Sequence, residues 1–161
     1  MIGILSDSHD NLVTLRRAVA LFNDCGCDLV IHAGDFVAPF AAAELRNLRA
    51  PVKAVFGNCD GERDGLARVF EGLGEIGQAP LSFIHAGLRF TVSHLDGPVA
   101  GYLEAIPCDV LVFGHTHKPV LEQRKGVLVL NPGEAGGWLH GRSTAAVLDP
   151  GARTVDFLDL A

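Results

Sequence analysis

The sequence has few cysteines, few aromatic residues other than phenylalanine, and no long apolar run. Of its 161 residues, four are cysteine, one is tryptophan and one is tyrosine. The cysteines, Cys25, Cys27, Cys59 and Cys108, form no Cys-x-x-Cys pair and no zinc-ribbon spacing. This usage excludes a small disulfide-stabilised scaffold and a structural zinc ribbon, and we expect reduced thiols.

Positive charge is also scarce. Thirteen lysine and arginine residues are set against nineteen aspartate and glutamate residues, which gives a net charge of −6. A protein that holds nucleic acid through a basic surface has the opposite balance, so we expect no nucleic-acid partner beyond a short oligonucleotide. Small phosphate-containing substrates are not excluded, because bound divalent cations can reverse the field of an acidic site.

Signals for export or membrane insertion are missing. No apolar stretch approaches the roughly 20 residues that a membrane-spanning helix needs. Residues 1–5 have the composition of a β-strand, without the basic stretch and cleavage site of a leader peptide. We therefore expect a protein without membrane contact, located in the cytoplasm.

Hydrophobic residues make up 48% of the sequence and occur in short, regularly spaced segments. In the first half, apolar runs alternate with segments that carry apolar side chains at helical spacing. Pro39 suits the start of the second such segment. This order is typical of βαβ units with a parallel sheet. We expect strands at residues 2–5, 28–32 and 51–56, and helices at residues 11–23 and 39–48.

The second half has a different pattern, in which short apolar segments follow one another. Tight turns such as Ala86-Gly87, Lys125-Gly126 and Pro150-Gly151 lie between them and favour hairpins. No linker or repeat divides the chain, so we expect one α/β domain over residues 1–161, with two packed sheets and helices outside. The expected strands are 76–78, 81–85, 89–94, 109–113, 120–124, 127–130, 143–148 and 154–158, with a helix at 97–106.

Residue types that bind metals are concentrated at the ends of the expected strands. Open α/β sheets place their ligand sites at such ends. Glycine directly precedes Asp35, Asn58 and His115, as a tight turn at a strand end would require. The five groups are Asp7-Ser8-His9, Gly34-Asp35, Gly57-Asn58-Cys59-Asp60, Ser93-His94 and Gly114-His115-Thr116-His117.

The mixture of donors indicates a catalytic dinuclear centre rather than a structural zinc site. Imidazole nitrogen binds Zn, Mn, Fe, Co and Ni, and carboxylate or amide oxygen suits harder ions such as Mn. A carboxylate such as Asp35 can bridge two ions. Two ions about 3.5–4 Å apart can hold a phosphoryl group and activate a water molecule between them.

The order Asp-x-His, Gly-Asp, Gly-Asn-x-Asp, strand-end His and Gly-His-x-His resembles the calcineurin-like metallophosphoesterase superfamily over nearly the whole chain. The short chain, residues 57–60 and residues 131–134 (Asn-Pro-Gly-Glu) are similar to its small prokaryotic phosphodiesterase branch. That branch is itself similar to the retromer subunit vacuolar sorting protein 29. The resemblance implies a four-layer α/β/β/α sandwich, in which two packed mixed β-sheets are flanked by helices.

The resemblance also implies two divalent metal ions and no organic cofactor. Manganese is the first expectation, and nickel, cobalt, iron and zinc are alternatives. A hydroxide held between the two ions would attack phosphorus in line, without a covalent enzyme intermediate. The implied ligands are Asp7, His9 and His117 for the first metal, Asn58, His94 and His115 for the second, and Asp35 for both.

Asn58, Cys59 and Asp60 form the expected catalytic loop, with Cys59 on the side of the leaving group. Larger members of the family carry a histidine at the position of Cys59. A thiol gives a departing alkoxide less help, so good leaving groups such as aryl oxides would be favoured. Asp60 is expected to orient a neighbouring ligand. Leu95 and Asp96 follow His94, where relatives usually carry a glycine and often a second histidine, and Asp96 would place a negative charge near the substrate.

Each of these residues has a simpler interpretation when taken alone. Aspartate and asparagine are common turn and cap residues, and Asp10 is at least as good a helix cap as Asp7. His115 and His117 point the same way only in an extended segment. The simpler interpretations combine poorly, because chance does not place seven donors at successive strand ends.

The remaining histidines have other expected roles. His32 is expected to be a hydrogen-bonded core histidine, and His85 a structural or surface residue. His140 lies in a glycine-rich loop, where lining the cleft is the alternative to a surface position. Arg142 is expected to pair with Asp149 across a hairpin rather than with a phosphate.

Three functions are compatible with this pattern. The leading hypothesis is a metal-dependent phosphodiesterase acting on a small-molecule phosphate ester, and a phosphomonoesterase or nucleotide phosphatase ranks second. A protein-binding scaffold like the retromer subunit ranks third, because eukaryotic scaffolds of that kind have lost metal ligands that this chain keeps. The apolar segment 155–160 would serve either a homodimer contact or the last core strand.

Overall fold

The computed structural model describes residues 1–161 and contains two mixed β-sheets. The first sheet runs in spatial order β11 (Thr154–Asp159), β10 (Thr144–Asp149), β1 (Ile2–Leu5), β2 (Leu29–His32), β3 (Val52–Val55) and β4 (Gly74–Gly77). The second runs β5 (Leu81–His85), β6 (Leu88–Val92), β7 (Val110–Val112), β9 (Val127–Pro132) and β8 (Pro119–Arg124).

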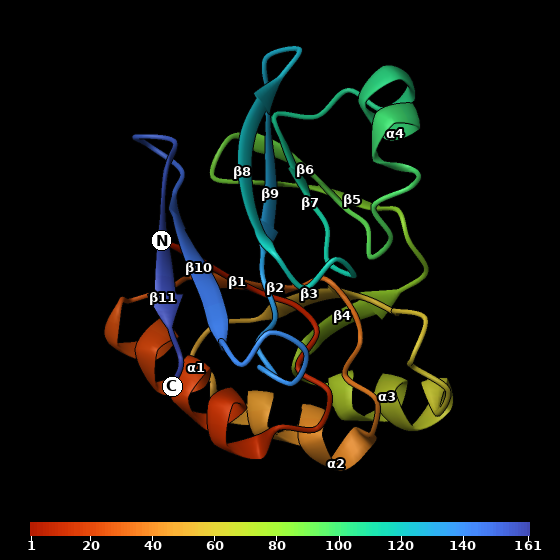
Figure 1. Cartoon of the computed structure of the whole chain (residues 1–161), viewed down its shortest axis with the longest axis vertical. Helices are drawn as coiled ribbons and strands as arrows, with labels where there is room; N and C mark the ends of the chain where they lie inside the picture. The colour runs from red at the N-terminus through yellow and green to blue at the C-terminus, as the bar shows by residue number, and fades with distance from the viewer.

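Helices cover the outer face of each sheet (Figure 1). Buried apolar side chains form one cluster of 22 residues between the first sheet and its helices, one of 15 between the sheets, and one of 6 beneath the last helix. The layers therefore follow the order α/β/β/α, which confirms the expected sandwich. The helices are α1 (Leu12–Asp24), α2 (Pro39–Ala42), the 3-10 helix η1 (Ala43–Asn47) and α3 (Arg63–Phe70) on the first sheet, and α4 (Val99–Ala105) on the second.

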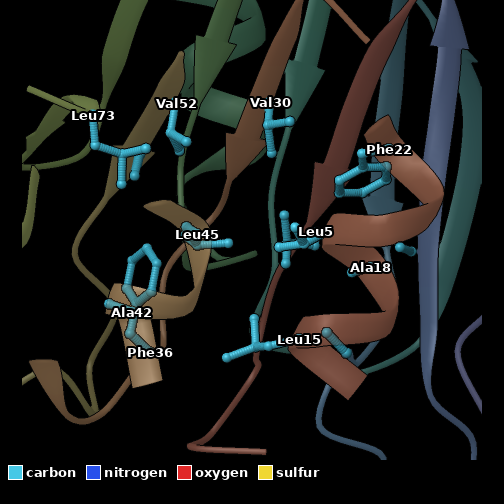
Figure 2. Close-up of a cluster of buried hydrophobic side chains, with 14 of the residues drawn as sticks. Leu5, Leu15, Ala18, Phe22, Val30, Phe36, Ala42, Leu45, Val52 and Leu73 are labelled. Carbon is cyan, nitrogen blue, oxygen red and sulfur yellow. The ribbon is translucent and has the colours of Figure 1, made fainter. Parts of the chain in front are cut away.

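Helix α1 shows how the sequence pattern becomes packing. Its buried residues Leu15, Ala18 and Phe22 recur every three or four positions, so they share one face of the helix. That face packs against Leu5 and Val30 of the first sheet (Figure 2). The amphipathic period read from the sequence thus fixes how α1 covers β1 and β2.

The start of α1 corrects the expected cap. Asn11 caps the helix, because its side chain accepts the backbone N–H of Thr14 at 3.3 Å. Asp10 does not cap it: its Oδ1 atom accepts the N–H of Ala38 at 2.9 Å. Asp10 therefore joins the loop after β1 to the loop after β2, and both loops carry predicted metal ligands.

One helical prediction was wrong in detail, and one helix was missed. The helix expected at residues 39–48 is divided into α2 and η1, since short 3-10 turns commonly serve as connectors. Helix α3 was not expected at all. It has eight residues, it includes Gly65, and only Leu66, Val69 and Phe70 are buried, so its apolar period is too short to detect. The other expected elements are present, with ends that differ by a few residues.

The C-terminal segment is a partly buried edge strand, β11, followed by the buried Leu160. Leu160 is buried, and Val155 and Leu158 pack against the two large apolar clusters. Phe157 is left partly exposed on the edge strand β11. All four cysteines are unpaired, as expected. None of the helices has the length and apolar character needed to cross a membrane.

Candidate metal centre

The predicted metal ligands converge at one edge of the two sheets. Strands β1, β2 and β3 are mutually parallel in the first sheet, and β6, β7 and β9 are parallel in the second. Because parallel strands end on the same side, the loops that follow them gather together. The ligands follow these ends directly: Asp7 and His9 after β1, Asp35 after β2, Asn58 after β3, His94 after β6, and His115 and His117 after β7.

Asp7, His9 and His117 form a first cluster, in which the ligating atoms lie within 4.8 Å of one another. Oδ1 of Asp7 is 3.4 Å from Nε2 of His117 and 4.0 Å from Nε2 of His9. The two imidazole rings stack, with centroids 5.2 Å apart. Asp7 is fully buried, and its Oδ2 atom accepts the Ser6 hydroxyl at 2.6 Å. Its carboxylate is therefore held in a fixed orientation beside both histidines.

Asp35, His94 and Asn58 form a second cluster beside the first. Oδ2 of Asp35 lies 3.4 Å from Nε2 of His94 and 3.5 Å from Nε2 of His9, so this carboxylate faces both clusters. Oδ1 of Asn58 is 2.8 Å from the same nitrogen of His94. This is the position that a bridging carboxylate needs, and the bridging role of Asp35 stays a prediction.

Two histidine nitrogens in these clusters, Nε2 of His9 and Nδ1 of His117, lack the partners that buried polar atoms normally have. Nδ1 of His94 faces the Ala33 carbonyl at 2.8 Å and must donate to it. Its Nε2 atom lies 2.8 Å from Oδ1 of Asn58 and 3.4 Å from Oδ2 of Asp35. Nε2 of His9 is buried without a hydrogen-bond partner. A divalent cation between these nitrogens and the carboxylates would satisfy them, so the donor set fits such ions.

The backbone at the site is strained. Asp7, His9, Asp35, His115 and His117 have φ angles of 53°, 40°, 61°, 67° and 58°. Residues other than glycine adopt this left-handed region uncommonly, at a cost of order 1–3 kcal/mol each. Strain of this kind clusters at functional sites, where the surrounding structure enforces it. His115 and His117 therefore approach the clusters from a bent segment, not from the extended one that the sequence had required.

Burial and neighbouring groups act differently on the two carboxylates. Burial raises the pKa of Asp7, and the Ser6 hydroxyl and His94 oppose this only in part. Burial also acts to raise the pKa of Asp35, but hydrogen bonds from His94 and Cys59 outweigh it and leave this pKa lowered. For His94, burial acts to lower the pKa, and Asp35 reverses the effect and raises it. Asp35 is thus the better prepared to stay ionised, as a metal ligand must.

Two of the motif glycines serve close packing rather than the tight turns that the sequence predicted. A Cβ atom at Gly57 would meet the carboxylate of Asp35, and one at Gly114 would lie 2.8 Å from Oδ2 of Asp7. Neither glycine has a positive φ, whereas Gly34, at 92°, has the expected turn conformation. The correction has a simple cause, because these loops pass over the ligand carboxylates too closely to leave room for a side chain.

Asp60 holds the loops together from beneath. It is 2% exposed, and its carboxylate accepts the backbone N–H groups of Asp35 at 3.0 Å, Phe36 at 2.8 Å, Val37 at 2.8 Å and Gly57 at 2.7 Å. These bonds join the loop after β2 to the loop after β3. Asp60 thereby fixes the backbone that carries Asp35, and its role in orienting a metal ligand stays a prediction.

His115 lies beside the second cluster. Its imidazole packs against that of His94 with centroids 5.3 Å apart, and its N–H donates to the Asp7 carboxylate at 3.1 Å. It is not among the groups of three whose ligating atoms lie within 4.8 Å. Its role as a ligand of the second metal stays a prediction.

Cys59 lies close to the carboxylate that faces both clusters. Its Sγ atom groups with the ligating atoms of His9 and Asp35 within 4.8 Å, and its N–H donates to Oδ1 of Asp35 at 2.8 Å. Burial, with the nearby Asp35, raises the pKa of the Cys59 thiol to about 11. Without a metal ion beside it, this group is therefore a thiol rather than a thiolate at neutral pH.

The clusters open into a cavity of about 580 Å³. Glu134 and Trp138 also line it, although the sequence had assigned neither to the site. Glu134 is fully buried after β9, and its Oε1 atom is 3.2 Å from Nδ1 of His117, outside hydrogen-bond geometry. A carboxylate behind a ligating imidazole recurs at metal sites. Its position in the sequence could have indicated this role. Glu134 follows the end of β9, which is parallel to β7, just as the predicted ligands follow the ends of parallel strands.

His32 is the core histidine that the sequence predicted. It is fully buried, its Nε2 lies 3.1 Å from the Ser8 hydroxyl, and its Nδ1 accepts the N–H of Gly34 at 3.2 Å. Its ring stacks on Phe36 with centroids 3.6 Å apart. Burial lowers the pKa of His32 well below its ordinary value, so the ring is neutral. It supports the loops and takes no part in the ligand clusters.

The other uncertain residues lie outside the cavity. His85 pairs with Asp28 at 3.2 Å on the surface. His140 and Asp96 are exposed and do not line the cavity. The expected pair of Arg142 with Asp149 is absent, because the Asp149 carboxylate instead accepts backbone N–H groups of its own turn.

Comparisons with known proteins relate the chain to one family. Residues 1–153 match the family model described as the calcineurin-like phosphoesterase superfamily domain. A phosphodiesterase of Methanocaldococcus jannaschii is 42% identical over 157 residues, covering 92% of each chain. Phosphodiesterase YfcE of Escherichia coli K12 is 35% identical over 145 residues, covering 80% of this chain and 75% of that one.

Solved structures give a consistent picture. An archaeal phosphodiesterase has a TM-score of 0.92 at 37% identity, with 98% of each chain covered. Vps29 of Entamoeba histolytica, in a single-mutant form, has a TM-score of 0.71 at 19% identity, also with 98% of each chain covered. At that identity the second likeness shows the fold alone.

Proposed function

The chain belongs to the calcineurin-like phosphoesterase superfamily, and we propose that it hydrolyses phosphodiesters as one domain spanning residues 1–161. Members of this family are metal-dependent phosphoesterases. The observation that carries the proposal is the pair of ligand clusters on either side of Asp35, with the buried nitrogen of His9 unpaired between them.

We infer that two divalent ions bind here. A donor set of imidazoles, carboxylates and an amide suits Mn first, with Ni, Co, Fe and Zn as alternatives. When bound, the ions supply positive charge to the phosphoryl oxygens and activate a water molecule. The residues that would hold them are Asp7, His9 and His117 for one ion, Asn58, His94 and His115 for the other, and Asp35 for both.

The protein itself contributes a rigid arrangement of donors. The Ser6 hydroxyl orients Asp7, the Ala33 carbonyl orients His94, and the N–H of Cys59 orients Asp35. Groups fixed before the substrate arrives need no reorganisation during the reaction, which is the main source of electrostatic catalysis. The open side of the cavity then receives the ester.

The charge of the cavity favours a diester over a monoester. No lysine or arginine lines it, and Asp10 and Glu134 add negative charge beside the ligand carboxylates. A phosphomonoester dianion carries one more negative charge than a diester, and without a cationic side chain it depends on the metal ions alone. The second candidate, a monoesterase or nucleotide phosphatase, therefore ranks below the phosphodiesterase.

Metal removal tests this proposal. The chelated protein is expected to be inactive on bis(p-nitrophenyl) phosphate, and activity should return when Mn²⁺, Ni²⁺, Co²⁺ or Zn²⁺ is added singly. Release of p-nitrophenolate is measured beside that from p-nitrophenyl phosphate. Faster monoester hydrolysis would support the second candidate. No turnover with any metal, despite two bound ions per chain, would favour a binding scaffold.

A second prediction concerns Cys59. Cys59→Ala is expected to retain two ions per chain and to slow hydrolysis of diesters with alkyl leaving groups about tenfold, with a smaller change for aryl esters. The reason is that a neutral thiol gives a leaving alkoxide modest help and binds metal poorly. Metal analysis and rates with both leaving groups check this, with the exposed Cys25→Ala as control. Loss of metal from Cys59→Ala alone would show that the thiol is a ligand.

We further propose that the protein works in the cytoplasm and forms a homodimer. Four unpaired cysteines favour a reducing compartment. The exposed Phe157 on the edge strand β11 offers a place for strand pairing between copies. Light scattering of the purified protein measures its mass in solution. A mass equal to that of one chain would contradict the proposed homodimer.

A further inference from the structure

One wall of the metal-site cavity is apolar and exposed. Trp138 and Leu139 line it and remain 63% and 68% exposed. Val37 lines the same cavity from the loop after β2. Trp138 is the only tryptophan of the chain. A large indole left open to solvent beside a charged site is unusual, because such side chains normally bury most of their surface.

Trp138 is held in place rather than left free at the surface. Its indole Nε1–H donates to the carbonyl of His9 at 3.0 Å, and its backbone N–H donates to Oε1 of Glu134 at 2.7 Å. The N–H of Leu139 donates to the same carboxylate at 3.1 Å. The indole is therefore fixed relative to a predicted metal ligand before any substrate binds.

The segment that carries this wall is also joined to the loop after β1. The N–H of Gly136 donates to the carbonyl of Asp7 at 2.9 Å, and Asn11 donates to the carbonyl of Gly136 at 2.8 Å. Glu134 is fully buried and faces His117 on one side and the backbone of residues 138–139 on the other. The same carboxylate thus lies between a predicted metal ligand and the apolar wall.

We propose that Trp138 and Leu139 form a subsite for an uncharged, planar aromatic substituent of the phosphodiester substrate, which stacks on the indole. The inference rests on the proposed function, since it names the substrate class of that same site. An aromatic ring fits because it gains most from a flat, fixed π-surface, and stacking tolerates many ring types.

The absence of cationic side chains decides that the substituent is uncharged. A second phosphate or a carboxylate near Trp138 would meet Asp10 and Glu134 without a lysine or arginine to balance them. The cavity, at about 580 Å³, lies within the range of small-molecule sites and accommodates a ring together with the phosphoryl group. Nucleosides and aryl groups meet both conditions.

Binding of two phosphonates to the metal-loaded protein tests the subsite without requiring turnover. The probes are the monoanions methyl 4-nitrophenylphosphonate and methyl methylphosphonate, which carry the single charge of a diester and differ in the ring. Calorimetry gives both dissociation constants, and we expect the aromatic probe to bind about tenfold more tightly. Because Trp138 is the only tryptophan, quenching of the intrinsic fluorescence by the nitrophenyl ring reports contact with this side chain.

Two variants and a control make the test decisive. Trp138→Ala should reduce the affinity ratio of the two probes at least fivefold, and Trp138→Phe should keep most of it, because it retains a ring but not the Nε1–H bond. The control is Phe40→Ala, an exposed aromatic outside the cavity, which should change nothing. Metal analysis of each variant verifies that the site is intact. If Trp138→Ala loses metal, quenching of the wild-type fluorescence by the nitrophenyl probe carries the test, because Trp138 is its only source.

The outcomes separate this inference from the proposed function. Ring-dependent affinity that is lost in Trp138→Ala supports the subsite, even if no ester is hydrolysed. An affinity ratio unchanged by Trp138→Ala, or wild-type fluorescence that the nitrophenyl probe leaves unquenched, overturns the subsite, even if metal-dependent turnover is present.

Discussion

Asp35→Asn is expected to lower metal-dependent phosphodiester hydrolysis on the order of a thousandfold or more. Oδ2 of Asp35 lies 3.5 Å from Nε2 of His9 and 3.4 Å from Nε2 of His94, so one substitution removes a negative charge from both clusters. An amide is nearly the same size as the carboxylate and can still accept the N–H of Cys59. The fold should therefore survive while affinity for metal falls.

The measurement is the turnover of bis(p-nitrophenyl) phosphate together with the number of ions bound per chain. Asp96→Asn is the matched control. Asp96 is an exposed carboxylate two residues after His94, and it does not line the cavity. It should retain nearly full activity and both ions. Two ions per chain and unchanged turnover in Asp35→Asn would contradict a bridging role.

Asp60→Ala is expected to lower the free energy of unfolding by about 3–5 kcal/mol. The carboxylate accepts four backbone N–H groups and is 2% exposed, so its removal leaves buried donors without an acceptor. Native domains are stable by only about 5–15 kcal/mol, so this is a large fraction of the total. The effect should be present without metal, because Asp60 acts on the backbone rather than on an ion.

Urea unfolding of the chelated protein measures this effect, through a lower midpoint at an unchanged slope. Asp156→Ala, which removes an exposed carboxylate from β11, is the control and should change stability by less than about 0.5 kcal/mol. Asp60→Asn should lie between the two, since its amide keeps one acceptor oxygen. A midpoint for Asp60→Ala equal to that of the wild type would show that water replaces the carboxylate at no cost.

Much of the fold was predictable because its signals are local. The strands at β1, β2 and β5 and the helix α1 follow from apolar periodicity within a few residues, and short-range turns marked the hairpins. Helix α3 was not predicted, because its eight residues include Gly65 and are too few to show a clear helical repeat of apolar side chains. The division of the predicted helix 39–48 into α2 and η1 was also not predicted, because the choice between α and 3-10 turns depends on packing.

For the candidate site, too, the features that depend on neighbouring residues were predictable and the contacts between distant residues were not. The sequence indicated which residues could bind metal, because donor types recur after successive strands. It could not show that Gly57 is required by the carboxylate of Asp35, or that Asp60 serves four N–H groups from two loops. Apart from the bond between Gly57 and Asp60, which are three positions apart, those relations join residues about 22 to 25 positions apart, and only folding brings them within contact.

By itself, the sequence determined the class of the protein: the order of its strands, the identity of its predicted metal donors and their position at the ends of parallel strands. The tertiary structure decided how those donors meet. It placed Asp35 between two clusters, put Glu134 behind His117 and fixed Trp138 at the rim of the cavity. The physical reason is that residue type and periodicity are properties of neighbouring residues, whereas distances between loops follow from how two sheets pack across a shared core.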